Sequence, residues 1–484
     1  MCAALLMLAC SSDSLYVYED TPFLPETPPI VEDFSTFVST EQASNVAQAF
    51  LGRHTDVAIS TRMAGEEPTI TTVQERGEPK MHIINYPGGG WVIVSATKNY
   101  FPVLAFSEEG SFEISDDMGG AIIWLAETKE AIQMSEAFDS ETKAGMHALW
   151  RSYTATGLDV GEVATRSWSP STPWDAMDYR IMELYFRYGP AGWFQFYSLQ
   201  DARAYLIHTP AWDLLHEMAY SVGSPPEFTI VAIRDNTVWQ WVGPLLTTRW
   251  HQGHPFNYLT PGDPFIPAGC VAIAMAQIMR FHRHPAHFDW NNMPNTDDVM
   301  SGIPTDFATP ALIRAIGDAV GMYWGPPPPH GIGSWTNNVN ARNAFVNRPF
   351  NYSSATLVNH NATQVRNEIL NNRRPVYMSG VNPNTGTGHA WVGDGVRYPQ
   401  RAYASFFVEF QINHWNGSFS YTRLGWSSPA QPATTSLPWS TPTLFHRNWG
   451  STSNLNVGWF MDTAITIDGS SNFSRDRQNI FVRP

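Results

Sequence analysis

The fold of this chain is decided by one stretch, Pro267-Ala268-Gly269-Cys270-Val271-Ala272-Ile273-Ala274-Met275-Ala276-Gln277-Ile278-Met279. From Val271 onward its residues favour a helix, and neither Gly nor Pro interrupts it before Pro285. Gly269 and the prolines before it do not continue the helix backwards, so Cys270 is predicted at the helix N-terminus. The unpaired N–H groups and the macrodipole there favour a thiolate, which is the nucleophilic form of cysteine. A buried structural cysteine is the alternative interpretation.

Cysteine usage sets Cys270 apart. The chain holds three cysteines, and the other two, Cys2 and Cys10, lie in an apolar N-terminal run. That run ends in Leu8-Ala9-Cys10-Ser11 and resembles a bacterial lipoprotein signal with Cys10 as the lipidated residue; plain secretion and a chance apolar start are the alternatives. Once such a signal is removed or lipidated, Cys270 is the single free thiol of an exported protein. Because a free thiol outside the cytoplasm is an oxidation hazard, its presence needs a reason.

Length and charge limit the class of protein. A chain of 484 residues has room for two or three domains, and 43% hydrophobic with 15% charged residues is typical of a globular protein. Lys and Arg number 29 against 44 Asp and Glu, a formal net charge of −15. Without a basic stripe to neutralise phosphates, neither nucleic acid nor an anionic membrane is an expected partner. The 19 tryptophans keep a carbohydrate-binding surface open.

The N-terminal part is predicted to hold an export signal with a flexible tether over 1–34 and a small α+β domain over 35–139. The tether is acidic and Pro-rich. A helix over 42–51 follows the capping residues Ser39-Thr40-Glu41. Strands over 81–86 and 91–95 flank a Pro-Gly-Gly-Gly turn, and a further strand and helix follow at 103–106 and 122–132. No catalytic cluster is evident in this domain.

Residues 140–242 form a processing linker or insertion of unknown fold, because a hundred residues is too long for a plain connection. Inside it, residues 228–233 and 237–241 predict a hairpin around Arg234-Asp235-Asn236. A second hairpin is predicted within 397–444, turning at Asn416-Gly417, since Asn-Gly is a strong signal for a tight turn.

Three further motifs bear on Cys270, and they occur along residues 243–484 in the order Gln252, Gly388-His389, Asn448-Trp449. Acyl transfer by a thiolate needs donors for the oxyanion, which the Gln252 amide and the backbone N–H of Cys270 supply. His389 follows a Gly-rich approach that lets a substrate backbone come close. An Asn448 side chain beside His389 would fix the imidazole, with Trp449 keeping water away.

A metal site is not expected. His282, His284 and His287 are closely spaced after the helix, but no carboxylate or cysteine pattern accompanies them, so a solvated helix end is the preferred interpretation. No other cofactor is expected either.

Together these motifs resemble the streptopain family of papain-clan cysteine peptidases. The resemblance rests on Gln252, Gly269-Cys270-Val271-Ala272, Gly388-His389-Ala390 and Asn448-Trp449-Gly450, and it covers residue 242 to the C-terminus. The first domain, through Gly88-Gly89-Gly90-Trp91-Val92-Ile93-Val94-Ser95-Ala96, is similar to the inhibitory prodomain of that family. Against the family pattern, a long segment, 397–444, separates the His strand from the Asn strand.

The resemblance implies an α+β fold, with a papain-like catalytic domain over 243–484 preceded by the prodomain. It implies an exported cysteine endopeptidase made as a zymogen, acting on proteins or peptides, with its own prodomain as intramolecular inhibitor. An outer-membrane lipid anchor through Cys10 is expected from the lipoprotein-like N-terminal run instead. Cys270 is then the nucleophile, His389 the general base and acid, and Gln252 the oxyanion donor. Asn448 and Trp449 match the position that orients the histidine, and Ser334 and Gly388 fall at substrate contacts. The rival interpretation is a catalytically silent, aromatic-rich surface-binding lipoprotein that kept the fold.

Overall fold

In the computed structural model the described residues are 36–54, 67–115, 118–154, 193–196, 227–235, 238–262, 266–297, 299–300, 303–326, 333–401, 403–413, 419–424, 433–436, 442–450, 456–462 and 477–484. The chain divides into two compact units, Met1–Thr36 and Phe37–Pro484. The predicted export signal and tether, including Cys10, lie outside the described residues, so the following concerns the second unit.

The predicted small α+β domain is present. Its elements are α1 (Thr40–His54), β1 (Thr69–Glu75), β2 (Glu78–Asn85), β3 (Trp91–Ser95), β4 (Val103–Ser107), α3 (Ala121–Ser135) and α4 (Ser140–Thr154). The predicted helix start is confirmed by a reciprocal cap, in which Gln42 N donates to Ser39 Oγ at 3.2 Å and Ser39 N donates to Gln42 Oε1 at 3.1 Å. The four strands pair antiparallel in sequence order.

Helix α4 extends this domain beyond the predicted boundary at residue 139. It packs against α1, and the Trp150 indole donates to the Tyr100 carbonyl at 2.7 Å. The sequence had no signal for this docking, because it depends on a buried hydrogen bond between distant segments. Residues 140–154, at the start of the region predicted to have an unknown fold, are therefore helical and pack on the first domain.

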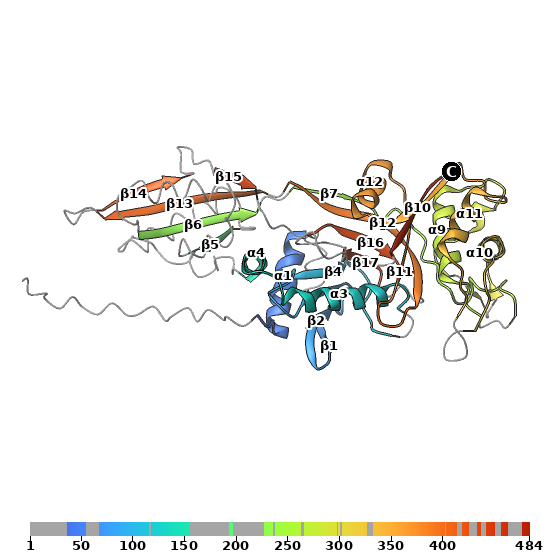
Figure 1. Ribbon diagram of the computed structural model, residues 1–484, viewed down its shortest axis with the longest axis horizontal. Coiled ribbons are helices and arrows are strands. Elements are labelled where there is room, and N and C mark those ends of the chain that lie inside the picture. The colour runs from blue at the N-terminus through green and yellow to red at the C-terminus, as the bar shows by residue number, and fades with distance from the viewer. Residues whose placement is uncertain are drawn as a thin grey trace, which may run out of the picture. The chain divides into compact units, whose positions relative to one another are not determined.

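The strands of the first domain continue into a larger sheet. β4 pairs with β17 (Gly458–Met461), and the order runs on through β16 (Leu444–Asn448), β12 (Gly388–Arg401), β11 (Val376–Val381), β18 (Gln478–Arg483) and β10 (Ser354–Asn359). Figure 1 shows blue β4 beside red β17 and β16, two parts far apart in the chain. Gly458 permits this approach, since a Cβ there would lie 2.6 Å from the Phe106 carbonyl oxygen.

Three helices of the second half gather around α9 (Cys270–His282). They are η1 (Trp290–Asn292), α10 (Ala308–Ala319) and α11 (Asn338–Val346), and a short ladder of β8 (Val299–Met300) and β9 (Ile303–Pro304) follows η1. Helix α12 (Ala362–Asn372) instead packs against β11 and β12. Every residue of α9 from Val271 to Met279 is buried, and a core cluster that includes α10 and α11 side chains packs on it. This burial fixes the start of α9, and hence the position of Cys270, relative to the sheet.

A second sheet is formed by strands from two segments, 140–242 and 397–444. It comprises β5 (Trp193–Phe196), β6 (Glu227–Asp235), β13 (Tyr403–Asn413), β14 (Phe419–Leu424) and β15 (Ala433–Ser436). The hairpin predicted within 397–444 is confirmed by the pairing of β13 with β14, and its tip at Asn416-Gly417 lies outside the described residues.

The hairpin predicted within 228–241 is wrong. β6 pairs with β13, whereas the next strand, β7 (Val238–Val242), pairs with β12. Residues 227–242 thus run antiparallel to 396–411 along a nearly continuous ladder. The polar Arg234-Asp235-Asn236 sequence suggested a turn, but a partner strand from elsewhere in the chain was available to both halves.

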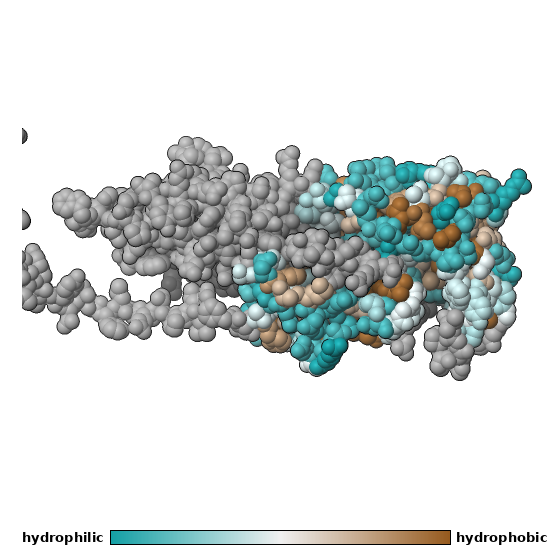
Figure 2. All heavy atoms as spheres, in the orientation of Figure 1, coloured by the Kyte–Doolittle hydropathy of each residue, from teal (hydrophilic) through white to brown (hydrophobic). Residues whose placement is uncertain are grey.

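The described part of the chain has a mostly hydrophilic surface on one face (Figure 2) and no membrane-spanning helix. None of the described helices is long and apolar enough to cross a membrane. On the face shown in Figure 2, hydrophilic side chains cover most of the described surface and apolar patches are smaller. The apolar residues of the motifs are instead found in the two core clusters.

Candidate active site

Cys270 occupies the first residue of α9, as the sequence predicts. Gly269 precedes it with φ of 85°, a conformation that strongly favours glycine. A Cβ at Gly269 would lie 2.8 Å from Cε of Met322 and 3.5 Å from Cβ of Ser334. The predicted substrate-contact residue Ser334 is therefore packed beside the residue that presents the thiol, and it is buried.

His389 lies opposite Cys270 near the start of β12. Its strand pairs with β11, where Gly380 faces His389 in register and Val381 faces the exposed Gly388. Burial alone would raise the pKa of the Cys270 thiol. The charge and hydrogen bond of His389, with backbone hydrogen bonds at Ala390 and Val271, outweigh that burial and lower the pKa below its ordinary value. The pair therefore favours a thiolate beside an imidazolium.

The backbone carbonyl of Trp449 provides the hydrogen-bond acceptor for Nε2 of the imidazole. Nε2 of His389 lies 3.0 Å from the carbonyl oxygen of Trp449. Because a carbonyl only accepts, Nε2 carries the hydrogen, which leaves Nδ1 for the thiol. The Trp449 indole donates to the Asn456 carbonyl at 2.8 Å and its ring packs 5.2 Å from that of Trp391. The acceptor is thus held in place by a buried aromatic anchor.

The hydrogen bonds of the Asn448 side chain are made to groups other than the imidazole. Its amide nitrogen donates to the Thr248 carbonyl at 2.9 Å and to Oε1 of Gln277 at 3.0 Å. Its amide oxygen accepts from Gly450 N at 3.2 Å and from Nε2 of Gln277 at 3.3 Å. The sequence predicted that the Asn448 side chain fixes the ring. In the structure these contacts anchor the backbone around Trp449 to the helix that carries Cys270.

Gln252 lies on a loop that contacts the residues just before α9. Its carbonyl oxygen accepts from the backbone N–H of Ala268 at 2.8 Å, and its side chain is half-buried. The neighbouring Trp250 is buried in the core beneath α9 and donates its indole N–H to the Pro294 carbonyl at 2.9 Å. The backbone hydrogen bond thus brings Gln252 to the two residues that precede Cys270.

The first domain reaches directly into this site. Gly119, just before α3, has φ of 56°, and a Cβ there would lie 3.0 Å from Nε2 of His389 and 3.2 Å from the Trp449 carbonyl oxygen. A Cβ at Gly120 would lie 2.6 Å from the Trp449 ring and 2.8 Å from that of Trp391. Two consecutive glycines therefore let the start of α3 lie against the imidazole and the aromatic residues behind it.

Four residues of the site were not predicted from the sequence. Gln277 lies seven residues after Cys270, on the same face of α9, and a buried polar residue in an apolar helix was a usable signal. The Gly119-Gly120 pair marked a close approach without naming its partner. Tyr377 is buried near the thiol, and its hydroxyl donates to Oδ1 of Asn338 at 2.9 Å. Its position near the thiol depends on how β11 packs against α9, which local sequence does not specify.

The described residues contain no group of three His, Cys, Asp or Glu side chains that could hold a metal ion. His282 instead contacts the Tyr352 hydroxyl at 3.2 Å through Nδ1, and burial, the largest cause, lowers its pKa to about 4. His284 Nε2 lies 3.4 Å from the Asn351 carbonyl.

This fold and site have the arrangement of a cysteine peptidase: a thiol–imidazole pair on a papain-like α+β domain, with a small α+β domain before it. Residues 35–132 match the family described as Spi protease inhibitor, and residues 250–288 and 286–428 match the family described as Peptidase C10. The comparisons therefore support the resemblance that the motifs predicted: one part of the chain is similar to the Peptidase C10, or streptopain, family, and the part before it to the Spi inhibitor type of prodomain.

Among curated proteins, the chain is similar to the thiol protease/hemagglutinin PrtT of Porphyromonas gingivalis, with 26% identity over 185 residues. The match covers 30% of this chain and 20% of PrtT, so the chain spans about a fifth of that relative. Among solved structures, a prointerpain A fragment from Prevotella intermedia has 16% identity and a TM-score of 0.45, covering 86% of this chain and 98% of that one. Active interpain A from the same organism has 19% identity and a TM-score of 0.34, covering 50% and 94%.

Proposed function

We propose that this protein is an exported cysteine endopeptidase made as a zymogen, which hydrolyses peptide bonds through a Cys270–His389 pair and a covalent acyl-enzyme. The proposal is carried by one observation: the thiol at the start of α9 is hydrogen-bonded to His389, and the prodomain residue Gly119 lies against that same imidazole. The first contact supplies an activated nucleophile, and the second blocks it until the prodomain leaves.

The chemistry follows from the donors at the site. The Cys270 thiolate attacks the scissile carbonyl carbon, and the backbone N–H of Cys270 with the Gln252 amide stabilises the oxyanion. The His389 imidazolium then protonates the departing amine, which leaves Cys270 acylated. A water molecule that gives its proton to His389 hydrolyses the thioester and restores the thiolate–imidazolium pair.

The remaining site residues are assigned supporting roles. The Trp449 carbonyl and the Asn448 anchor keep the imidazole oriented during both proton transfers. Ser334 and Gly388 contact the substrate backbone on either side of the thiol. In terms of domains, we assign 1–34 to the export signal and tether, 35–154 to the prodomain including α4, and 243–484 to the catalytic domain. Lipidation at Cys10, with anchoring to an outer membrane, is part of the proposal.

Replacement of the nucleophile tests the function. Cys270→Ala in the full-length chain should abolish both casein hydrolysis and self-cleavage, because a nucleophile and its base act as a unit and losses of about a millionfold follow the removal of either. A thiol reagent directed at the active site should label the wild type at mildly acidic pH and spare the Ala variant. Casein hydrolysis that continues unchanged in Cys270→Ala would leave the silent binding lipoprotein as the better interpretation.

A further inference from the structure

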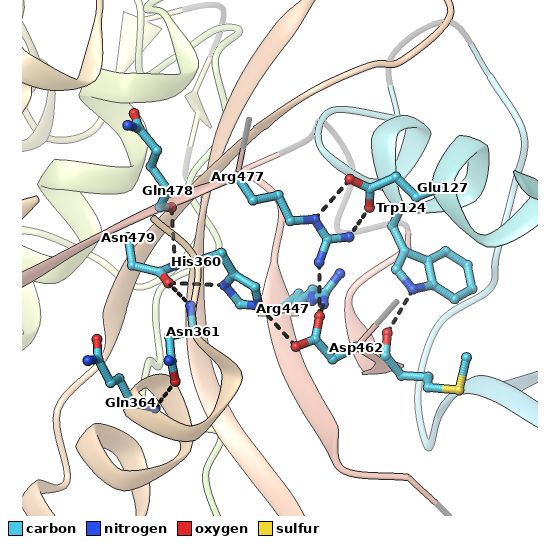
Figure 3. A network of polar contacts seen from close by, with 11 residues as sticks. Trp124, Glu127, His360, Asn361, Gln364, Arg447, Asp462, Arg477, Gln478 and Asn479 are labelled. Carbon is cyan, nitrogen blue, oxygen red and sulfur yellow. Dashed lines mark hydrogen bonds and ion pairs between the residues drawn. The ribbon is translucent and has the colours of Figure 1, made fainter. Parts of the chain in front are cut away.

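A buried cluster of charged groups joins the prodomain to the catalytic domain (Figure 3). The guanidinium of Arg477 donates from Nε to Oε1 of Glu127 at 2.9 Å, and from Nη2 to the other oxygen of the same carboxylate. Its Nη1 donates to Oδ1 of Asp462 at 2.9 Å. Asp462 also contacts His360 at 2.9 Å and Arg447 at 3.5 Å. Glu127 comes from prodomain helix α3, whereas the other four residues belong to the catalytic domain.

Arg477 lies close to the active site across the sheet. Gly380 of β11 faces His389 of β12 in register, and a Cβ at Gly380 would lie 3.4 Å from Cγ of Arg477. The register of β11 with β18, in which Ser379 faces Gln478, places Arg477 opposite Gly380. Since neighbouring strands are about 4.8 Å apart, the Arg477 backbone lies about 10 Å from that of His389.

Prodomain helix α3, together with the glycine just before it, crosses these strands with one contact residue on each. Gly119 lies against His389, Ile123 lies 3.5 Å from the Cβ position of Gly380, and Glu127 binds Arg477. Ile123 and Glu127 are four positions apart in α3, about one helical turn, so they point to one side, and Gly119 precedes the first turn of the helix. Departure of the prodomain therefore uncovers a path from His389 to Arg477 in one step.

The direction of this path follows from the chemistry of His389. The imidazolium must reach the amine that leaves, so the part of a substrate after the scissile bond lies on the His389 side of the thiol. An extended chain advances about 3.3 Å per residue, so about three residues reach from His389 to Arg477. The region that α3 covers is therefore the one that this part of a substrate needs.

We propose that Arg477 is a specificity-determining residue of the activated enzyme, and that it binds the carboxylate of an Asp or Glu side chain about three residues after the scissile bond. This inference rests on the proposed peptidase function. Asp462 holds one edge of the guanidinium, so the Nε–Nη2 edge that receives Glu127 in the precursor is already oriented. A planar guanidinium presenting two parallel donors is suited to bidentate binding of a carboxylate. Glu127 thus occupies the position that an acidic substrate residue takes after activation.

The test compares matched peptides that differ by Glu or Gln at the second, third or fourth residue after the scissile bond. The full-length chain is first activated by removal of its prodomain, and kcat/KM is measured for each pair. We expect Glu to be preferred about tenfold at one of these positions, as for a charge-assisted hydrogen bond. Arg477→Gln should bring this ratio close to one, and Arg477→Lys should restore it in part because it keeps the charge without the fork.

The control is Arg483→Gln, on the same region of chain, where the side chain pairs with Glu368 instead. That variant should retain the wild-type ratio. A ratio near one at every position in the wild type, which needs no variant to interpret, overturns the inference while leaving the peptidase function intact. A preference that survives in Arg477→Gln also overturns it. Complete absence of Cys270-dependent cleavage of every peptide refutes the proposed function and this inference together.

Discussion

Glu127→Gln should weaken the hold of the prodomain on the catalytic domain. Glu127 is 3% exposed and Arg477 2% exposed, so solvent screens their interaction little. Burial lowers the pKa of Arg477 to about 9, and the guanidinium therefore stays charged at neutral pH. The substitution keeps the shape of the side chain and one acceptor oxygen but removes the negative charge.

The expected magnitude follows from these contacts. Breaking a buried ion pair by removing one partner costs about 3–5 kcal/mol. Because Gln keeps an acceptor for Nε of Arg477, and Asp462 remains bound to Nη1, a loss of about 2–3 kcal/mol is expected, in the range of one charge-assisted hydrogen bond. At 1.4 kcal/mol per tenfold, the fraction of molecules with an undocked prodomain should rise about 30- to 150-fold.

The assay is the rate at which a peptidyl thiol reagent labels Cys270 in intact full-length chain, read over times too short for self-cleavage. The rate should rise in proportion to the undocked fraction, because Gly119 lies against His389 in the docked form. Glu130→Gln is the matched control, since Glu130 is exposed on the same helix. A folded Glu127→Gln chain that is labelled within twofold of the wild-type rate would refute the reasoning. A double-mutant cycle with Arg477→Gln would then measure any coupling directly.

Three further predictions concern the active site, the contact between β4 and β17, and the second sheet. The pH profile of kcat/KM should be bell-shaped. Activity is lost at low pH because the Cys270 thiolate, whose pKa is lowered, becomes protonated, and at high pH because His389 loses its proton. A steady rise of kcat/KM through about pH 9 would contradict a thiolate–imidazolium pair. Gly458→Val should speed labelling of Cys270 in the full-length chain, because the added side chain would clash with the prodomain residues Phe106, Trp91 and Ser107. A labelling rate equal to that of wild type would mean that the contact between β4 and β17 does not hold the prodomain in place. Replacing 400–440 by a short Gly-Ser link should make β6 sensitive to limited proteolysis, since it loses β13 and keeps only β5 as a partner. Unchanged fragments on a gel would mean that β5 and β6 are stable without β13.

Local sequence was sufficient wherever one segment carries its own signal. The apolar run after Cys270 predicts a buried helix, and Gly269 predicts where that helix begins, since few other residues adopt its backbone conformation. The reciprocal cap of Ser39 and Gln42 is likewise a property of four consecutive residues. The order of the Gln, Cys, His and Asn-Trp motifs was enough to indicate the family, because each motif presents one chemical group.

What the sequence by itself determined, then, is the chemistry of the site and the elements that present it; which groups meet was decided by tertiary structure. Asn448 was expected at the imidazole, yet the Trp449 carbonyl lies there, because a backbone oxygen has no sequence signature and Gln277 engages the Asn448 amide. Residues 227–242 pair with 396–411 rather than folding back on themselves, since a strand accepts any partner whose edge is free. Glu127 and Arg477 are 350 residues apart and meet only because β4 and β17 join two domains into one sheet.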